Sequence, residues 1–216
     1  MNLLDQTIGE IACELPGATA VFHAHRLDFC CGGGKPLREA IAKRGADEQA
    51  VLAGLAALAP RSDGQSDWRE VASPELIEHL LTRFHARHRD QLPELIRLAR
   101  RVEHVHGERP ECPRGLADHL EFMASELESH MQKEEQILFP MMVAASPMAA
   151  APIAVMRFEH DQHGDSLARL EALTQDITPP PGACNTWRAL YAGLAQLRSD
   201  LMEHIHLENN VLFERV

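Results

Sequence analysis

Two copies of one pattern place a histidine and a glutamate where they could bind a metal ion together. The pattern H-x-x-x-E-x-x-[IV]-L-F begins at His130 and again at His204. On a helix, residues i and i+4 lie one above the other on the same face. His130 is thereby paired with Glu134, and His204 with Glu208. Two such faces brought together would form a pocket lined with metal ligands.

Both pairs interrupt stripes of apolar residues that step along the helix by four and three. The first stripe is Leu116, Leu120, Met123, Leu127, His130, Glu134, Ile137 and Met141. The second is Trp187, Leu190, Leu194, Leu197, Leu201, His204, Glu208 and Val211. Such stripes form the seam of a helical bundle. The alternative is a hydrogen-bond network without metal, but buried carboxylates are normally paired or metal-bound, which favours a shared cation.

Two further stripes offer histidines in pairs three residues apart. One consists of Leu81, His85, His88 and Leu92, and the other of Met156, His160, His163, Leu167 and Leu170. Each stripe directs two imidazoles inward. The pattern alone does not choose within either pair.

Four long helical segments must position these side chains. They are expected at 73–106, at 114–144, from Pro152 to about Asp176, and at 186–213, separated by short breaks rich in proline and glycine. Short breaks between long helices favour antiparallel neighbours. The fold class predicted is all-α, with an up-down-up-down four-helix bundle at 73–216.

A small helical domain is expected at 1–59, joined to the bundle by a polar linker at 60–72. Its predicted helices are Ala18–His25, Leu37–Arg44 and Asp47–Leu58. A segment of this length is near the lower limit for an independent core. We therefore expect it to pack against the bundle or against a second copy of the chain in a homodimer.

Composition and charge restrict the partners and the compartment. The formal charge of −11 argues against binding to nucleic acid or to an anionic membrane and favours cations. The acidic start lacks the pattern of a signal peptide, and the longest apolar run is too short to cross a bilayer. The five cysteines are an odd number without disulfide-framework spacing. A reducing compartment, the cytoplasm, is expected.

The donor set favours two metal ions over one. Two histidines and two glutamates from the repeats, with one histidine from each remaining helix, exceed the needs of a tetrahedral zinc site. Mixed imidazole and carboxylate ligands with open positions favour iron or manganese over zinc or calcium, and iron suits chemistry with oxygen or nitric oxide.

The chain resembles the repair-of-iron-centres (RIC, ScdA/YtfE) family, which places a hemerythrin-like di-iron bundle after a small N-terminal domain. The resemblance covers almost the whole chain. Its matching segments are Asp28-Phe29-Cys30-Cys31-Gly32-Gly33, Phe84 to Leu95, Ser129 to Pro140, Glu159-His160-Asp161 and Glu203 to Phe213.

The resemblance implies which residues hold the two iron ions, with Glu134 and Glu208 as bridges. The implied ligands are His85, His130, Glu134, His160, His204 and Glu208. His163 is then expected beside the ligands or in solvent, and His206, which points away from His204, in solvent.

Four further residues are implied in supporting roles. Glu126 and Glu159 match family acids that line an access path, whereas the sequence alone predicts acids on the surface or beside the ligands. Cys30 and Cys31 are expected to be either two free thiols in a glycine-rich turn, or a catalytic redox pair or transient metal ligand that serves the di-iron site.

The function implied is repair of iron–sulfur clusters damaged by nitrosative or oxidative stress, by donating iron or handling nitric oxide. Reduction of nitric oxide as an enzymatic activity stays open. The alternative is a hemerythrin-like module that senses or carries oxygen, nitric oxide or iron. The expected partners are proteins with damaged or apo iron–sulfur clusters, with nitric oxide or oxygen as small ligands.

Overall fold

The computed structural model describes residues 2–58 and 67–216, and every regular element in these ranges is helical. Most of the predicted linker at 60–72 lies outside the described residues. The chain divides into two compact units, one of Ile77–Leu201 and one of Met1–Leu76 with Met202–Val216. Within the described ranges, every helix is too short or too polar to cross a membrane.

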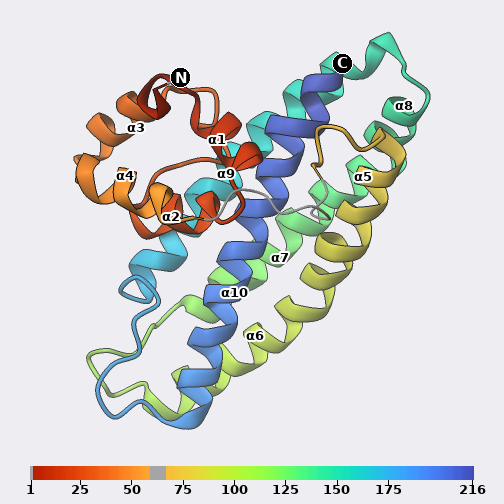
Figure 1. Ribbon diagram of the computed structural model, residues 1–216. Coiled ribbons are helices and arrows are strands. Elements are labelled where there is room, and N and C mark those ends of the chain that lie inside the picture. Colours follow the sequence, from red (N-terminus) through yellow and green to blue (C-terminus); the bar gives the residue numbers. More distant parts are fainter. Residues whose placement is uncertain (1, 59–66) are drawn as a thin grey trace. The chain divides into compact units, whose positions relative to one another are not determined.

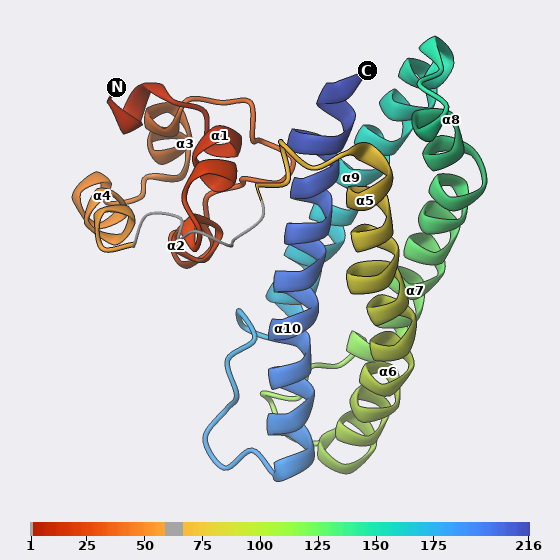
Figure 2. The same ribbon diagram turned by 45° about the vertical axis from the view of Figure 1, so that its right-hand side comes forward.

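Four long helices form the bundle (Figure 1). They are α6 (Ala86–His106), α7 (Leu116–Lys133), α9 (Ala150–Leu173) and α10 (Asn185–Leu207). Figure 2 again shows α6, α7 and α10 side by side. The predicted fold class, an all-α up-down-up-down bundle, is confirmed.

Polar contacts between neighbouring helices link α6, α10, α9 and α7 in turn inside the larger unit. Gln91 of α6 donates to the carbonyl oxygen of Gly193 in α10 at 3.4 Å. Arg198 of α10 reaches Glu171 of α9 at 3.0 Å. His119 of α7 hydrogen-bonds the carbonyl oxygen of Ser166 in α9 at 2.8 Å. The apolar stripes fill the space between these contacts, with Leu120, Leu170, Trp187 and Leu194 fully buried.

Three of the helical rods contain a π-helical turn. The turns are η2 (Leu80–His85), η3 (Glu134–Leu138) and η5 (Glu208–Leu212). In η3 the amide of Phe139 donates to the carbonyl of Glu134, and in η5 that of Phe213 donates to Glu208. Each of these hydrogen bonds spans five residues instead of the four of an α-helix. Such π turns often occur at functional sites. Each π turn begins or ends at a predicted metal ligand.

The π turns correct the predicted stripes. Ile137 was expected in the core but is 53% exposed, whereas Leu138 is 1% exposed and Met142 is 7% exposed. A π turn inserts one residue into the α-helical period, so the buried face continues one position later. The same insertion in η2 buries Leu80 in place of Leu81.

The N-terminal part of the smaller unit consists of four short helices. They are α1 (Ile8–Glu14), α2 (Ala18–Ala24), α3 (Leu37–Arg44) and α4 (Glu48–Ala56). Thr7 and Glu10 form a capping box at the start of α1. Buried apolar residues join the helices, among them Ile8, Phe22, Leu37, Val51 and Leu55. Helix α1 was missing from the sequence prediction.

The contact of His119 with α9 predicts a pH dependence of stability. Burial lowers the pKa of His119 below its usual value, against the opposing effect of the hydrogen bond to Ser166. The unfolded chain therefore binds a proton more readily, and stability is lost as the pH falls below about 6.5. His119→Gln, which keeps a donor but does not titrate, should flatten this loss in urea unfolding between about pH 7 and 5. An unchanged slope would contradict the assignment.

Candidate metal centre

Six buried side chains form two overlapping groups of potential metal ligands. One group contains His85, Glu134, His204 and Glu208, and the other His130, Glu134, His160 and Glu208. Within each group, one ligand atom from every residue lies within 4.8 Å of the others. Glu134 and Glu208 belong to both groups. The structure thus brings together all six residues that the family resemblance implied.

The imidazole Nε2 atoms converge on the carboxylates. The Nε2 atom of His130 lies 3.4 Å from Glu134 Oε1, and that of His85 lies 3.5 Å from Glu134 Oε2. His204 Nε2 lies 3.0 Å from Glu208 Oε1. The Nε2 atoms of His130 and His160 are 3.1 Å apart. Four ring nitrogens thus approach one another or the two glutamates.

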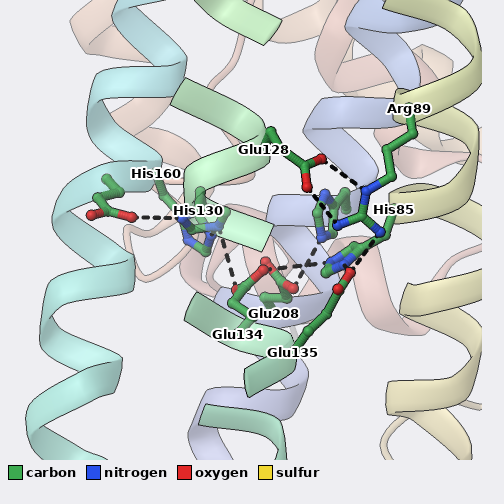
Figure 3. A network of polar contacts seen from close by, with 10 residues as sticks. His85, Arg89, Glu128, His130, Glu134, Glu135, His160 and Glu208 are labelled. Atoms are coloured by element: carbon green, nitrogen blue, oxygen red, sulfur yellow. Dashed lines mark hydrogen bonds and ion pairs between the residues drawn. The ribbon is translucent and has the colours of Figure 1, made fainter. Parts of the chain in front are cut away.

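Carboxylates behind two of the histidines set which ring nitrogen carries the proton. His85 Nδ1 lies 2.8 Å from Glu135 (Figure 3). His130 Nδ1 lies 2.9 Å from Glu159. A carboxylate accepts, so Nδ1 carries the proton and Nε2 keeps its lone pair. Pairs of this kind orient histidines that bind metal and make them more basic. No role was predicted for Glu135 from the sequence, although this residue directly follows Glu134.

Basic side chains hold these outer carboxylates in place. Arg89 contacts Glu135 and Glu128, each at 2.8 Å, and Lys133 pairs with Glu159 (Figure 3 shows Arg89). Burial acts to raise the pKa of Glu135, but Arg89 and His85 outweigh it and the pKa lies below its usual value. The pKa of Glu159 is likewise lowered, because Lys133 and His130 outweigh burial. Both carboxylates are therefore ionised acceptors near neutral pH.

The surroundings of Glu134 fit a bound cation. Its side chain is fully buried, and neither carboxylate oxygen accepts a hydrogen bond from residues 2–58 or 67–216. A carboxylate removed from water needs a partner, since desolvation without one is costly. The neighbouring groups are Nε2 lone pairs, which repel a carboxylate and attract a metal ion. The donor chemistry therefore suits cations shared between the histidines and the glutamates.

The stripes left open the choice within two pairs of histidines. In each pair, the histidine that the resemblance did not assign as a ligand is buried. His88 is fully buried, and its ring centroid lies 6.5 Å from that of Phe84. His163 is 6% exposed, and its ring stands edge-on to His130 with centroids 4.9 Å apart. Of its two predicted environments, His163 occupies the one beside the ligands. Neither residue belongs to the two donor groups.

The expectation that His206 faces solvent is wrong. His206 is 3% exposed, its Nε2 atom lies 3.6 Å from Cys13 Sγ, and its Nδ1 atom accepts a hydrogen bond from Asn210 Nδ2 at 3.0 Å. Its ring also stands edge-on to Phe29. Burial lowers the pKa of His206 to about 4. The helix face opposite the ligands is therefore covered within the smaller unit, which a helical period cannot reveal.

The two acids predicted beside the site differ in placement. Glu159 hydrogen-bonds His130, whereas Glu126 is exposed and takes part in none of the site contacts described above. The role of either along an access path stays a prediction.

Cys30 and Cys31 are thiols in this structure. Their Sγ atoms are 3.9 Å apart, and Cys30 is buried while Cys31 is half-buried. The hydrogen bond to Cys31 and burial raise the pKa of Cys30 well above its usual value. A protonated Cys30 is a poor nucleophile. A redox role for the pair remains a prediction.

Substituting Glu159 with alanine should weaken metal binding at the group that contains His130. Loss of a carboxylate that orients a ligand typically costs 10- to 100-fold in affinity. Competition titrations with a metal-sensitive chelator measure the effect. Glu126→Ala is the matched control and should bind as the wild type does. Equal affinities for Glu159→Ala and the control would contradict the orienting role.

The fold and the donor groups define a class of protein: an all-α bundle whose core is suited to binding cations. Two family models match the sequence. The hemerythrin HHE cation binding domain matches residues 76–216, and ScdA_N, described as a domain of unknown function (DUF542), matches residues 4–59.

Curated relatives match along the full chain. The "Iron-sulfur cluster repair protein YtfE" of Yersinia pseudotuberculosis serotype IB (strain PB1/+) is 50% identical over 216 residues, covering 100% of this chain and 98% of the relative. The protein of the same name from Dickeya chrysanthemi (strain Ech1591) is 49% identical with the same coverage. The chain therefore belongs to the hemerythrin HHE family and, along its whole length, to the family of YtfE proteins.

Proposed function

We propose that this chain binds two iron ions in the bundle and uses them to repair iron–sulfur clusters damaged by nitrosative or oxidative stress. His85 and His204 would hold one ion, His130 and His160 the other, and Glu134 and Glu208 would bridge them. The observation that carries this proposal is that both glutamates belong to both donor groups. Bridging carboxylates with imidazole caps are typical of paired iron ions.

The donor set and the relatives support the repair role together. The relatives are named iron-sulfur cluster repair proteins and share half of the residues over the full length. Iron bound there would supply redox and Lewis-acid chemistry toward nitric oxide, or it would be the source of iron for a cluster. The chain's own residues orient the imidazoles, keep the outer carboxylates ionised and exclude water from Glu134.

The partners proposed are proteins whose iron–sulfur clusters are damaged or absent, met in the cytoplasm. An excess of acidic residues suits a protein that attracts cations. Nucleic acid and membranes are not among the proposed partners.

An anaerobic repair assay tests this function. A cluster-containing dehydratase inactivated by nitric oxide is incubated with the iron-loaded chain, a thiol reductant and inorganic sulfide. Recovery of dehydratase activity above that obtained with the same free iron is expected, and Glu134→Ala should give none of this gain. Equal recovery with free iron, or with the variant, would overturn the proposal.

A further inference from the structure

A third group of donors lies in the N-terminal region, in the loop between α2 and α3. We propose that Asp28, Cys30 and Cys31 form a separate site for a thiophilic divalent cation such as Zn²⁺ or Fe²⁺. One ligand atom from each residue lies within 4.8 Å of the others. Two sulfurs and one carboxylate oxygen would fill three positions of a tetrahedron and leave the fourth open.

The two donor separations that involve Cys30 fit tetrahedral coordination. Metal–sulfur bonds of about 2.3 Å at the tetrahedral angle place two sulfurs about 3.8 Å apart. The observed separation of Cys30 Sγ and Cys31 Sγ is 3.9 Å. With a metal–oxygen bond of about 2.0 Å, sulfur and oxygen should lie about 3.5 Å apart. Cys30 Sγ lies 3.5 Å from Asp28 Oδ1.

Hydrogen bonds within the loop and from η5 hold the segment that carries the three donors. The amide of Cys31 donates to Asp28 Oδ1 at 3.0 Å, which turns the carboxylate back over the sulfurs. Asn209 Nδ2 donates to the carbonyl oxygen of Cys30 at 3.1 Å. Asn210 Nδ2 donates to that of Phe29, also at 3.1 Å. The backbone that carries Cys30 is thus fixed by the turn η5 of the same unit.

Two glycines make room for this arrangement. A Cβ atom on Gly32 would lie 2.8 Å from the carbonyl oxygen of Asp28 and 3.0 Å from its Oδ2 atom. A Cβ atom on Gly33 would lie 2.3 Å from Asn210 Oδ1, closer than real Cβ contacts come. Side chains at these positions would displace the Asp28 carboxylate and the Asn210 side chain, which hydrogen-bonds the carbonyl oxygen of Phe29. The glycines therefore preserve the donor geometry.

The binding reaction exchanges protons for the cation. Both thiols lose a proton, two metal–sulfur bonds form, and the protons pass to buffer, with no change of oxidation state. The hydrogen bond to Cys31 and burial keep the pKa of Cys30 high without a cation. A metal ion lowers the pKa of the thiol, because it binds the thiolate form. The half-buried Cys31 and the exposed Asp28 leave a path for the cation and for a fourth ligand.

Cobalt titration of the full chain tests this site independently of the bundle site. Only a thiolate ligand gives a sulfur-to-cobalt charge-transfer band in the near ultraviolet. We expect that band to saturate when about one cobalt ion per chain is bound by thiolate. About two protons should be released as this ion binds. It should persist in Glu134→Ala, in which the bundle site is damaged, and in the matched control Cys184→Ser.

The loop variants give the opposite result. Cys30→Ser and Cys31→Ser should each lose most of the band, and Asp28→Asn should weaken cobalt binding by more than about tenfold. Zinc should also protect Cys31 of the wild type from alkylation. A wild type without a thiolate band, or a band that survives in Cys30→Ser, would overturn the proposal. Neither result would bear on repair by the bundle.

Discussion

Replacing Glu134 with alanine is expected to remove both metal ions from the bundle, whereas replacing His85 with alanine should leave about one. Glu134 belongs to both donor groups, so its loss takes a ligand from each ion. His85 belongs to one group only. The pair His130 and His160 would still hold the other ion between the two glutamates.

Iron analysis of anaerobically loaded and desalted protein measures this difference. Glu126→Ala is the matched control, since its carboxylate is exposed. It should retain the wild-type metal content. A full complement in Glu134→Ala, or an equal loss in His85→Ala and Glu134→Ala, would contradict the shared role of the glutamate.

Replacing Glu134 with leucine is expected to stabilise the metal-free protein, by about 1–3 kcal/mol. The carboxylate is fully buried, and in the described part of the chain neither oxygen accepts a hydrogen bond. An apolar side chain of similar size removes the cost of burying a polar group without a partner. A site built to bind cations is in this way unfavourable until it is filled.

Urea unfolding of the metal-free and iron-loaded forms measures both effects. Iron should stabilise the wild type by an amount that grows with the logarithm of its affinity, and it should stabilise Glu134→Leu far less. The order of stability of the two proteins is thus expected to reverse on loading. If Glu134→Leu destabilises the metal-free form, Glu134 belongs to a structural hydrogen-bond network that needs no cation.

The ligand helices could be predicted from local spacing. His130 and Glu134 stand one helical turn apart, and the apolar residues before them repeat with the helical period. Backbone geometry alone then places both side chains on the buried face. The choice of His85 over His88 could not be made in this way, because both lie on that face. It came from resemblance to a family.

The π turns could not be predicted from that spacing. A stripe of alternating fours and threes continues through Glu134 to Ile137, but the inserted residue moves the buried face to Leu138. Propensity does not signal such a turn, since packing of the bundle decides where it forms. The outer carboxylates depend on contacts between helices as well. Glu135 and Arg89 are distant in sequence and meet only when α6 and η3 pack.

The burial of His206 has the same origin. Its neighbours Cys13 and Phe29 come from the other end of the chain. The period of a single helix predicts that the face away from the ligands is exposed to solvent. Long-range packing covers that face instead, and no local pattern in 204–213 indicates this.

Anomalous scattering at the iron edge from crystals of the iron-loaded chain tests the central claim most directly. We predict two peaks in the bundle, one beside His85 and His204 and one beside His130 and His160, with Glu134 and Glu208 contacting both. A single peak, or two peaks that do not share these glutamates, would contradict the paired centre.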